Sequence, residues 1–169
     1  MEQIDFRNDI LPLKDSLFRL ALRITLNKAE AEDVVQETMI KVWNRRNNCE
    51  NIDSIEAFCF TVCRNLALDK TKAKANQGEP LDGAELQASA NATPEEQTER
   101  NDKVELVKDI INNLPEKQRT AIQLREFEEK SYKEIADVMG ISEEQVKINI
   151  FRARQTIRKK YLEKENYGL

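Results

Sequence analysis

The sequence contains no histidine, only three cysteines, and just four glycines and four prolines among 169 residues. Cys59 and Cys63 can share a helix face, but two thiols cannot complete a zinc site, which usually takes four ligands. We therefore expect buried, unreactive thiols, no metal site and no cofactor. An odd number of cysteines without a secretory signal indicates a reducing compartment, so the predicted localisation is cytoplasmic.

Long apolar runs and catalytic motifs are missing as well. No stretch approaches the roughly 18 apolar residues of a membrane helix, and the first residues, MEQIDFRNDI, lack the basic start and apolar run of a signal peptide. We therefore expect no direct membrane insertion. Without a histidine, a Gly-rich phosphate loop or an activated nucleophile, the chain is predicted not to be an enzyme and to have no small-molecule substrate.

The composition is rich in charge instead: 34% of the residues are charged and only 6% are aromatic. With so few glycines and prolines, this balance favours an all-α protein over a sheet protein. The formal net charge is −4. Any binding to DNA therefore has to come from local basic patches rather than from the surface as a whole.

Apolar spacing divides the chain into an N-terminal helical domain at 1–72, a linker at 73–92 and a C-terminal helical domain at 93–169. In the first domain, three apolar stripes at helical spacing predict a small bundle. The stripes are Leu13, Leu17, Leu20, Ala21 and Ile24; Ala31, Val34, Val35, Thr38, Val42 and Trp43; and Phe58, Val62, Leu66 and Leu68. Asp53, followed by Glu56, is predicted to cap the third helix. The linker is polar and Ala-rich, which is typical of a flexible tether.

The C-terminal domain is predicted to start at Thr93 as helix cap, with Pro94 at the first helical position. One helix carries Val104, Leu106, Val107, Ile110, Ile111 and Leu114, and the next carries Ala121, Ile122, Leu124 and Phe127. Two capping boxes follow, Ser131 with Glu134 and Ser142 with Gln145, and Gly140 stands between them where a helix must end with a positive φ. Two short helices joined by such a turn predict a helix-turn-helix.

The last predicted helix has two different faces. At 100° per residue, one stripe collects Val146, Ile150, Ala153, Ile157 and Tyr161, and it is predicted to face the core. The opposite side carries Ile148, Phe151, Arg152, Gln155, Arg158 and Lys159. Between Val146 and Lys160 there are six basic residues and no acidic one, which points to contact with DNA. Arg and Gln can bond base edges, whereas Lys147, Arg158, Lys159 and Lys160 are predicted to contact phosphates.

Two further clusters allow more than one interpretation. The acidic residues Glu30, Glu32, Asp33 and Glu37 can form a solvated helix face, a carboxylate pair for metal or acid–base chemistry, or a surface that docks a basic protein. Near the end of the third helix, the sequence places Arg64, Asn65, Lys70, Lys72 and Lys74 after Phe58 and Phe60. This second cluster suits unpaired DNA bases, on which aromatic rings stack, and equally suits lysines that complement the helix dipole.

Three stretches together resemble one known family, the extracytoplasmic-function (ECF) group of sigma-70 RNA polymerase sigma factors. Ala31–Trp43 is similar to the helix with which that family binds core polymerase, and Phe58–Asp69 is similar to its promoter-melting segment. Tyr132–Ala136, Gly140–Ile141 and Val146–Arg154 resemble its helix-turn-helix. The three matches occur in the family's order and cover both predicted domains.

The resemblance implies a protein that binds core RNA polymerase and promoter DNA, directs initiation, and has an anti-sigma factor as a further partner. The residues implied at core polymerase are Asp33, Gln36, Glu37, Ile40 and Trp43. Those implied at the −10 element are Asn47, Asn48, Asn51 and Asp53 in one loop and Asn65, Asp69 and Lys72 on the third helix, with Arg64 of the basic cluster beside them. Those implied at the −35 element are Lys147, Ile148, Asn149, Phe151 and Arg152, to which the outward helix face adds Gln155 and Arg158.

Three other interpretations of the residues stay open. A stand-alone helix-turn-helix regulator would bind duplex DNA tightly without polymerase, usually as a dimer on a palindrome. A helical adaptor would use its basic helix to dock an acidic protein and would not need DNA. A metal-dependent enzyme would lose its function on chelation.

Overall fold

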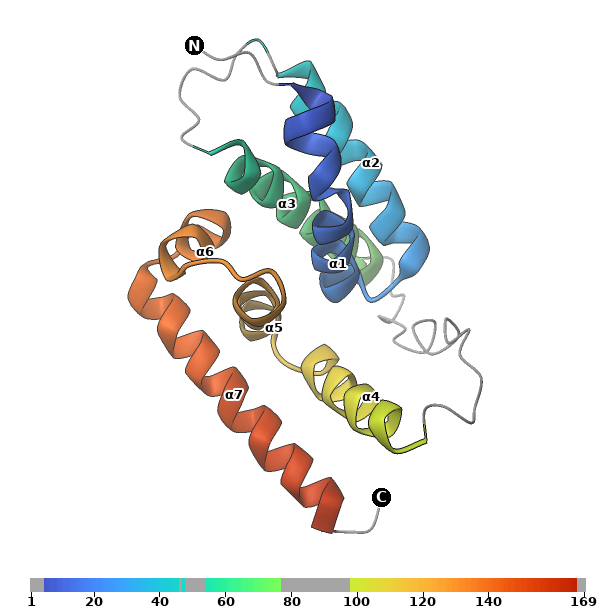
Figure 1. The fold of residues 1–169 in the computed structure, drawn as a ribbon, viewed down its shortest axis with the longest axis vertical. Coiled ribbons are helices and arrows are strands. Elements are labelled where there is room, and N and C mark those ends of the chain that lie inside the picture. The colour runs from blue at the N-terminus through green and yellow to red at the C-terminus, as the bar shows by residue number, and fades with distance from the viewer. Residues whose placement is uncertain (1–4, 46, 48–53, 77–97, 167–169) are drawn as a thin grey trace.

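The structure, a computed structural model, describes residues 5–45, 47, 54–76 and 98–166. Every regular element in those ranges is a helix, which confirms the all-α prediction (Figure 1). The α-helices are α1 (Lys14–Thr25), α2 (Lys28–Asn44), α3 (Ile55–Asn76), α4 (Thr98–Asn112), α5 (Glu116–Ile122), α6 (Tyr132–Met139) and α7 (Glu143–Asn166). No described helix is long and apolar enough to cross a membrane. Residues 77–92 of the expected linker, the predicted helix start at Thr93 and Pro94, and the loop residues Asn48, Asn51 and Asp53 lie outside the described residues.

The N-terminal unit is a bundle of α1, α2 and α3, and α1 packs against both of the others. The stripes predicted for the first two helices are buried or partly buried, with the exception of Trp43. Trp43, which is predicted both on the second stripe and at core polymerase, is 43% exposed, and its ring meets that of Phe6 edge-on with the centroids 5.4 Å apart. Neighbouring residues of a helix point about 100° apart, so Val42 occupies the core position and turns Trp43 outward.

Helix α3 differs from its prediction in three ways. It continues to Asn76, so residues 73–76, expected in the linker, are helical. Its N-terminus is capped by Ser54, whose Oγ accepts a hydrogen bond from the Ala57 amide at 3.2 Å, one residue later than the predicted cap at Asp53. Of the predicted stripe only Leu66 is buried; the other buried residues of α3 are Cys59, Phe60, Cys63, Arg64 and Ala67. The buried side of α3 differs from the predicted stripe because a second helical unit covers another side of this helix.

The C-terminal unit consists of α4 to α7 and contains the predicted helix-turn-helix. Both capping boxes are formed, at Ser131 and at Ser142. Between them Gly140 has φ +65°, a left-handed conformation that glycine adopts without strain. Val146, Ile150 and Ala153 are buried as predicted, and Ile157 and Tyr161 are half-buried.

Two apolar residues predicted to lie on core stripes of this unit are exposed, Val104 and Phe127. After α5 the chain widens into a π-helical turn, Gln123–Phe127 (η5). The additional residue in that turn rotates Phe127 away from the stripe that Ala121 and Ile122 begin. Arg23 of α1 lies over the exposed ring, with its guanidinium carbon 5.6 Å from the centroid.

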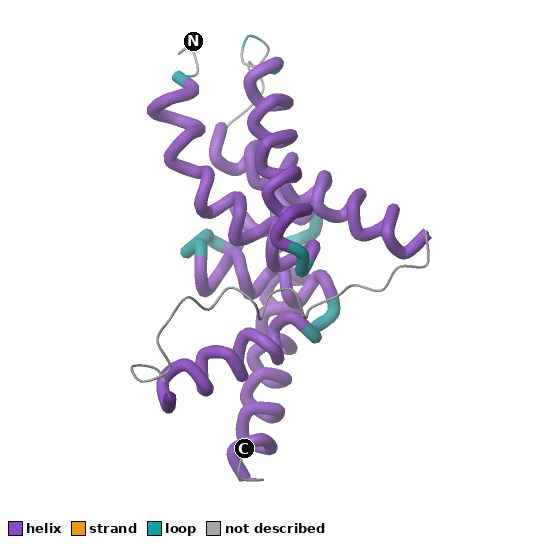
Figure 2. Tube along the Cα trace, turned by 90° about the vertical axis from the view of Figure 1, so that its right-hand side faces the viewer, coloured by secondary structure: helices purple, strands orange, loops and turns teal. Residues whose placement is uncertain are grey.

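The two units are in direct contact rather than apart. Helix α1 packs against α5 and η5, and α3 packs against α6. Figure 1 shows α5 next to α1 and α6 next to α3, and Figure 2 shows the same helical assembly turned by 90°. One continuous apolar cluster includes buried residues of both units. The prediction of two tethered domains does not include this contact.

Cys59 and Cys63 are buried, as expected from the sequence. Burial raises the pKa of Cys63 to about 12, and its Sγ donates a hydrogen bond to the Leu17 carbonyl at 3.4 Å. Because the thiolate is the reactive form, we expect neither thiol to be alkylated by iodoacetamide at pH 8 in the native protein, and both to be alkylated in denaturant. Peptide mass mapping measures this, and rapid native labelling of either residue would contradict it.

Candidate functional site

The outward face of α7 is an exposed strip of basic, polar and apolar side chains. Phe151 is 61% exposed and Ile148 47%. The predicted contact residues Lys147, Arg152, Gln155 and Arg158 are also exposed. Asn149 lies at the edge of the strip, with its Nδ2 donating to the Gln145 carbonyl at 2.8 Å. Exposing a phenylalanine ring to water is unfavourable. Its position between cations therefore indicates that this strip is a binding surface.

The charge on this face depends on residues outside α7. Arg125 of η5 places its guanidinium 4.2 Å from the centroid of the Tyr132 ring, and Lys147 Nζ lies 5.5 Å from the same centroid. Arg125 therefore adds a cation beside Lys147 that helix periodicity did not identify. By contrast, a hydrogen-bonded ion pair with Glu126 raises the pKa of Arg154 and offsets its positive charge. Arg154 thus contributes little to attraction of an anion.

The exposed face of α2 carries the residues predicted to contact core polymerase. Asp33, Gln36 and Glu37 are exposed, Ile40 is 59% exposed, and Trp43 lies one turn further along. Two of the acidic residues form ion pairs with α3: Glu30 with Lys74 at 3.1 Å and Glu37 with Lys70 at 3.8 Å. Because Ile40 and Trp43 expose large apolar surfaces beside carboxylates, this face suits a protein partner with a basic, partly apolar surface.

A hollow of about 440 Å³ lies between the end of α2 and α3. It is lined by Lys41, Asn44, Arg45, Phe58, Val62, Asn65, Leu66 and Asp69. The Arg45 guanidinium carbon lies 5.6 Å from the centroid of the Phe58 ring. The structure thus brings Asn65 and Asp69, two of the residues predicted at the −10 element, to one wall of a hollow that offers an aromatic ring, a cation and amide groups.

The other residues predicted at the −10 element are placed differently. Lys72 is exposed on the last part of α3, and Asn47 is exposed after α2. Arg64 is only 8% exposed, because it lies on the side of α3 that the C-terminal unit covers, where it pairs with Glu116 of α5 at 3.2 Å. Phe60 is 1% exposed, with Lys130 Nζ 5.1 Å from its ring centroid. Arg64 and Phe60 are therefore inaccessible to DNA in this conformation.

Comparison with known proteins identifies the class. Residues 10–77 match the family model for sigma-70 region 2, and residues 105–157 match that for sigma-70 region 4. The chain is 30% identical over 150 residues to the ECF RNA polymerase sigma factor SigM of Bacillus subtilis, across 87% of this chain and 89% of the relative. It is 32% identical over 162 residues to the RNA polymerase sigma-H factor of Pseudomonas aeruginosa, across 89% and 84%.

The fold agrees with this family. The sigma factor RpoE from Bartonella quintana, solved in complex with the anti-sigma factor NepR, superposes with a TM-score of 0.76 at 22% identity, over 92% of this chain and 96% of that one. The chain belongs to the sigma-70 family, and within it to the ECF RNA polymerase sigma factors. It is therefore not an enzyme: it binds core RNA polymerase and promoter DNA and directs transcription initiation.

Proposed function

We propose that each of the three surfaces described above makes a different contact of a sigma factor. The α2 face with Gln36, Glu37 and Ile40 docks on core polymerase, the hollow beside α3 contacts the −10 element, and the outward face of α7 reads the −35 element. The observation that carries the proposal is the α7 strip, where exposed Arg152 and Gln155 supply base-edge donors next to exposed Phe151.

The charge distribution supports this division. The net charge of −4 opposes binding of the free protein to DNA, while the stretch of α7 from Val146 to Lys160 carries six basic residues and no acidic one. A weak DNA-reading face becomes effective once the protein is held by polymerase, because tethering converts promoter binding into a local event at high effective concentration. The proposal therefore requires the α2 and α7 faces to act in the same complex.

The hollow beside α3 is suited to a nucleobase drawn out of the duplex. A base inserted there would meet the Phe58 ring and the amide of Asn65, and base–aromatic stacking is a common way to hold single-stranded DNA. Asn47, Asn48, Asn51 and Asp53, which lie between α2 and α3 in the sequence, are proposed to complete the −10 contact. Lys72 is proposed to contact the DNA backbone.

This proposal for α3 predicts a specific defect in promoter melting. Asn65→Ala removes an exposed amide, and the loss of one hydrogen bond to a base is expected to lower open-complex formation about two- to tenfold. Reactivity of promoter thymines with permanganate measures the opening, and core-polymerase affinity is expected to stay unchanged. The matched control is Asn76→Ala, which removes the same exposed side chain near the end of the same helix. Equal melting by the parent and Asn65→Ala would remove this residue from the −10 contact.

We further propose that the protein acts in the cytoplasm and is held inactive by an anti-sigma factor. Two solved structures of similar fold, RpoE and CnrH, are complexes with the anti-sigma factor NepR and with the cytosolic domain of CnrY. The chain exposes large apolar side chains on both units, including Ile40, Trp43 and Phe151. An anti-sigma factor that covers them would block the α2 and α7 faces together.

A further inference from the structure

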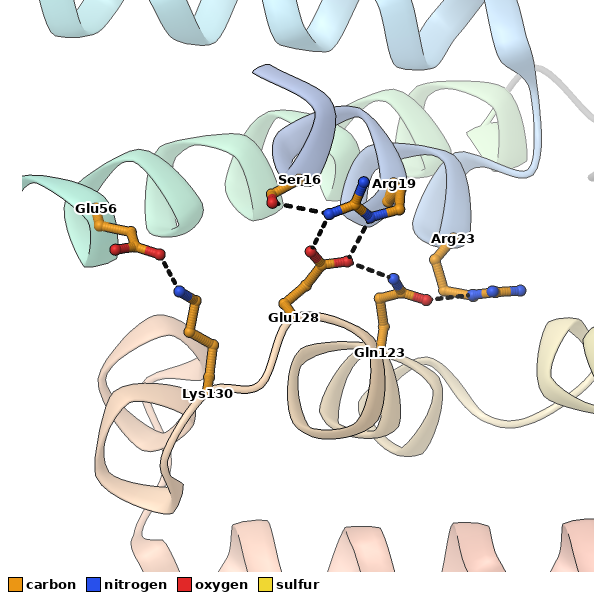
Figure 3. A network of polar contacts seen from close by, with 7 residues as sticks. All are labelled: Ser16, Arg19, Arg23, Glu56, Gln123, Glu128 and Lys130. Carbon is orange, nitrogen blue, oxygen red and sulfur yellow. Dashed lines mark hydrogen bonds and ion pairs between the residues drawn. The ribbon is translucent and has the colours of Figure 1, made fainter. Parts of the chain in front are cut away.

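Polar residues of the two units meet in a connected network at their interface, shown in Figure 3. Arg19 of α1 holds Glu128, the residue after η5, through two hydrogen bonds, Nε to Oε2 at 3.0 Å and Nη2 to Oε1 at 2.7 Å. The Glu128 side chain is 1% exposed. Gln123 Nε2 donates to the same carboxylate at 2.8 Å, and Arg23 Nε donates to Gln123 Oε1 at 2.8 Å. Two arginines of α1 are thus bound to the C-terminal unit.

Two more ion pairs cross the same interface, and both come from α3. Lys130 pairs with Glu56 in the first turn of α3. Arg64, farther along α3, pairs with Glu116 in the first turn of α5. Glu56 and Arg64 are both on the side of α3 that packs against the C-terminal unit, so the pairs hold α3 at two points.

The conformation of the segment between η5 and α6 places Glu128 and Lys130 at the interface. Glu129 has φ +56°, a left-handed conformation that a residue with a side chain adopts only at a cost. Lys130 donates its backbone amide to the Leu124 carbonyl at 2.9 Å, which folds the segment back on η5. This turn directs Glu128 toward α1 and Lys130 toward α3 (Figure 3).

The interface combines the shared apolar cluster with buried charged groups that are imperfectly paired. Burial, together with the nearby positive charge of Arg119, lowers the pKa of Arg23 to about 10, so two cations are crowded there. Among the described residues, the buried Nε atoms of Arg64 and Arg119 have no hydrogen-bond partner. Contacts between domains that separate in function are typically polar in this way, and an unpaired buried donor weakens the closed arrangement.

The closed arrangement is incompatible with simultaneous contact with both promoter elements. Elements centred about 25 base pairs apart lie about 85 Å apart on straight DNA at ~3.4 Å per base pair. The helix-turn-helix packs directly on α3, and the 24 residues of α7 span only about 36 Å. The α3 and α7 faces therefore cannot reach the two elements until the units separate.

We propose that the three ion pairs Arg19–Glu128, Glu56–Lys130 and Arg64–Glu116 form an autoinhibitory clasp that holds the free protein closed and prevents α3 and α7 from contacting both promoter elements at once. This inference rests on the proposed function of α3 and α7. Opening the clasp releases two buried residues of the predicted melting segment from the C-terminal unit: Arg64, which pairs with Glu116, and Phe60, which Lys130 contacts. The clasp is intrinsic to the chain and acts without an anti-sigma factor.

The test begins with a variant that opens the clasp from the N-terminal unit alone. Arg19→Glu with Glu56→Lys places like charges opposite Glu128 and Lys130, and both side chains are 40% exposed or more, so the unit itself is expected to fold. The matched control is Lys14→Glu with Asp9→Lys, the same charge changes at exposed positions of the same unit. Adding Lys130→Glu to the opening variant restores one pair with reversed charges.

Small-angle X-ray scattering of the free proteins decides whether the clasp exists. We expect a small radius of gyration for the parent and the control, a larger one for the opening variant, and an intermediate one when Lys130→Glu is added. A parent that is already extended, or an opening variant as compact as the control, would overturn the clasp. This measurement does not depend on any transcriptional function.

Open-complex formation with core polymerase then decides whether the clasp inhibits. If closed molecules are incompetent, apparent activity scales with the open fraction, and we expect the opening variant to form open complexes about tenfold faster at limiting protein. An extended variant that initiates no faster than the control would overturn inhibition while leaving the sigma-factor function intact. If neither the parent nor the variant initiates, the proposed function is wrong, and the inhibitory role is wrong with it. The scattering measurement would still show whether the ion pairs hold the two units together.

Discussion

Arg152→Glu is expected to abolish promoter-specific initiation while leaving the affinity for core polymerase unchanged. Arg152 is exposed near the middle of the outward face of α7, next to Phe151. A base or phosphate contact of arginine is worth about 1–3 kcal/mol, and reversal of the charge adds repulsion from the DNA backbone. Together these effects predict a loss of about 100-fold or more in run-off transcript from a cognate promoter.

The matched control for this variant is Lys164→Glu. It makes the same change of charge on the same helix, at an exposed residue in the last turn and beyond the predicted contact residues. We expect it to retain most of the activity. If Arg152→Glu lost core binding and initiation equally, the residue would serve folding rather than DNA contact, and melting temperatures of both variants would show this.

Gln36→Ala with Glu37→Ala is expected to weaken binding to core polymerase about tenfold or more and to reduce initiation at every promoter alike. Both side chains are exposed on α2 beside Ile40. Hydrogen bonds from a charged group across an interface are worth about 1.5–3 kcal/mol. The fold is expected to be unaffected, because the ion pair that is lost, between Glu37 and Lys70 at 3.8 Å, lies at the surface, and such pairs contribute little stability.

The concentration dependence of initiation distinguishes a defect in docking on core polymerase from a defect in DNA recognition. Raising the concentration of the variant is expected to restore initiation, because the DNA-reading face is intact, whereas no concentration restores Arg152→Glu. Glu163→Ala, an exposed acid lost from α7, is the control for charge. A double variant that binds core polymerase as tightly as the parent would show that the docking face lies elsewhere.

The sequence predicted those parts of the molecule that local rules determine. Both capping boxes, the turn at Gly140 and the inner stripe of α7 follow from hydrogen bonds and periodicity within one or two helical turns. The outward position of Phe151 follows from the same periodicity, so helical spacing is sufficient to locate the candidate reading face.

Contacts between the units could not be predicted in this way. Arg64 has the same local features as a solvated helix-end cation, and only the packing of α6 and α5 on α3 buries it. Glu56 has the spacing of a capping residue, but it pairs with Lys130, which is 74 residues away. Arg125 reaches Tyr132 through the geometry of the π-helical turn. Partners so distant in sequence leave no periodic pattern, because any solvated charge satisfies the same local rules.

Run-off transcription with purified bacterial core polymerase, a promoter-fragment library and this protein shows whether the protein directs polymerase to particular promoters. We expect discrete new start sites that share two upstream motifs and disappear with Arg152→Glu. No initiation above that of core polymerase alone, combined with tight and specific binding of duplex DNA by the free protein, would contradict this expectation.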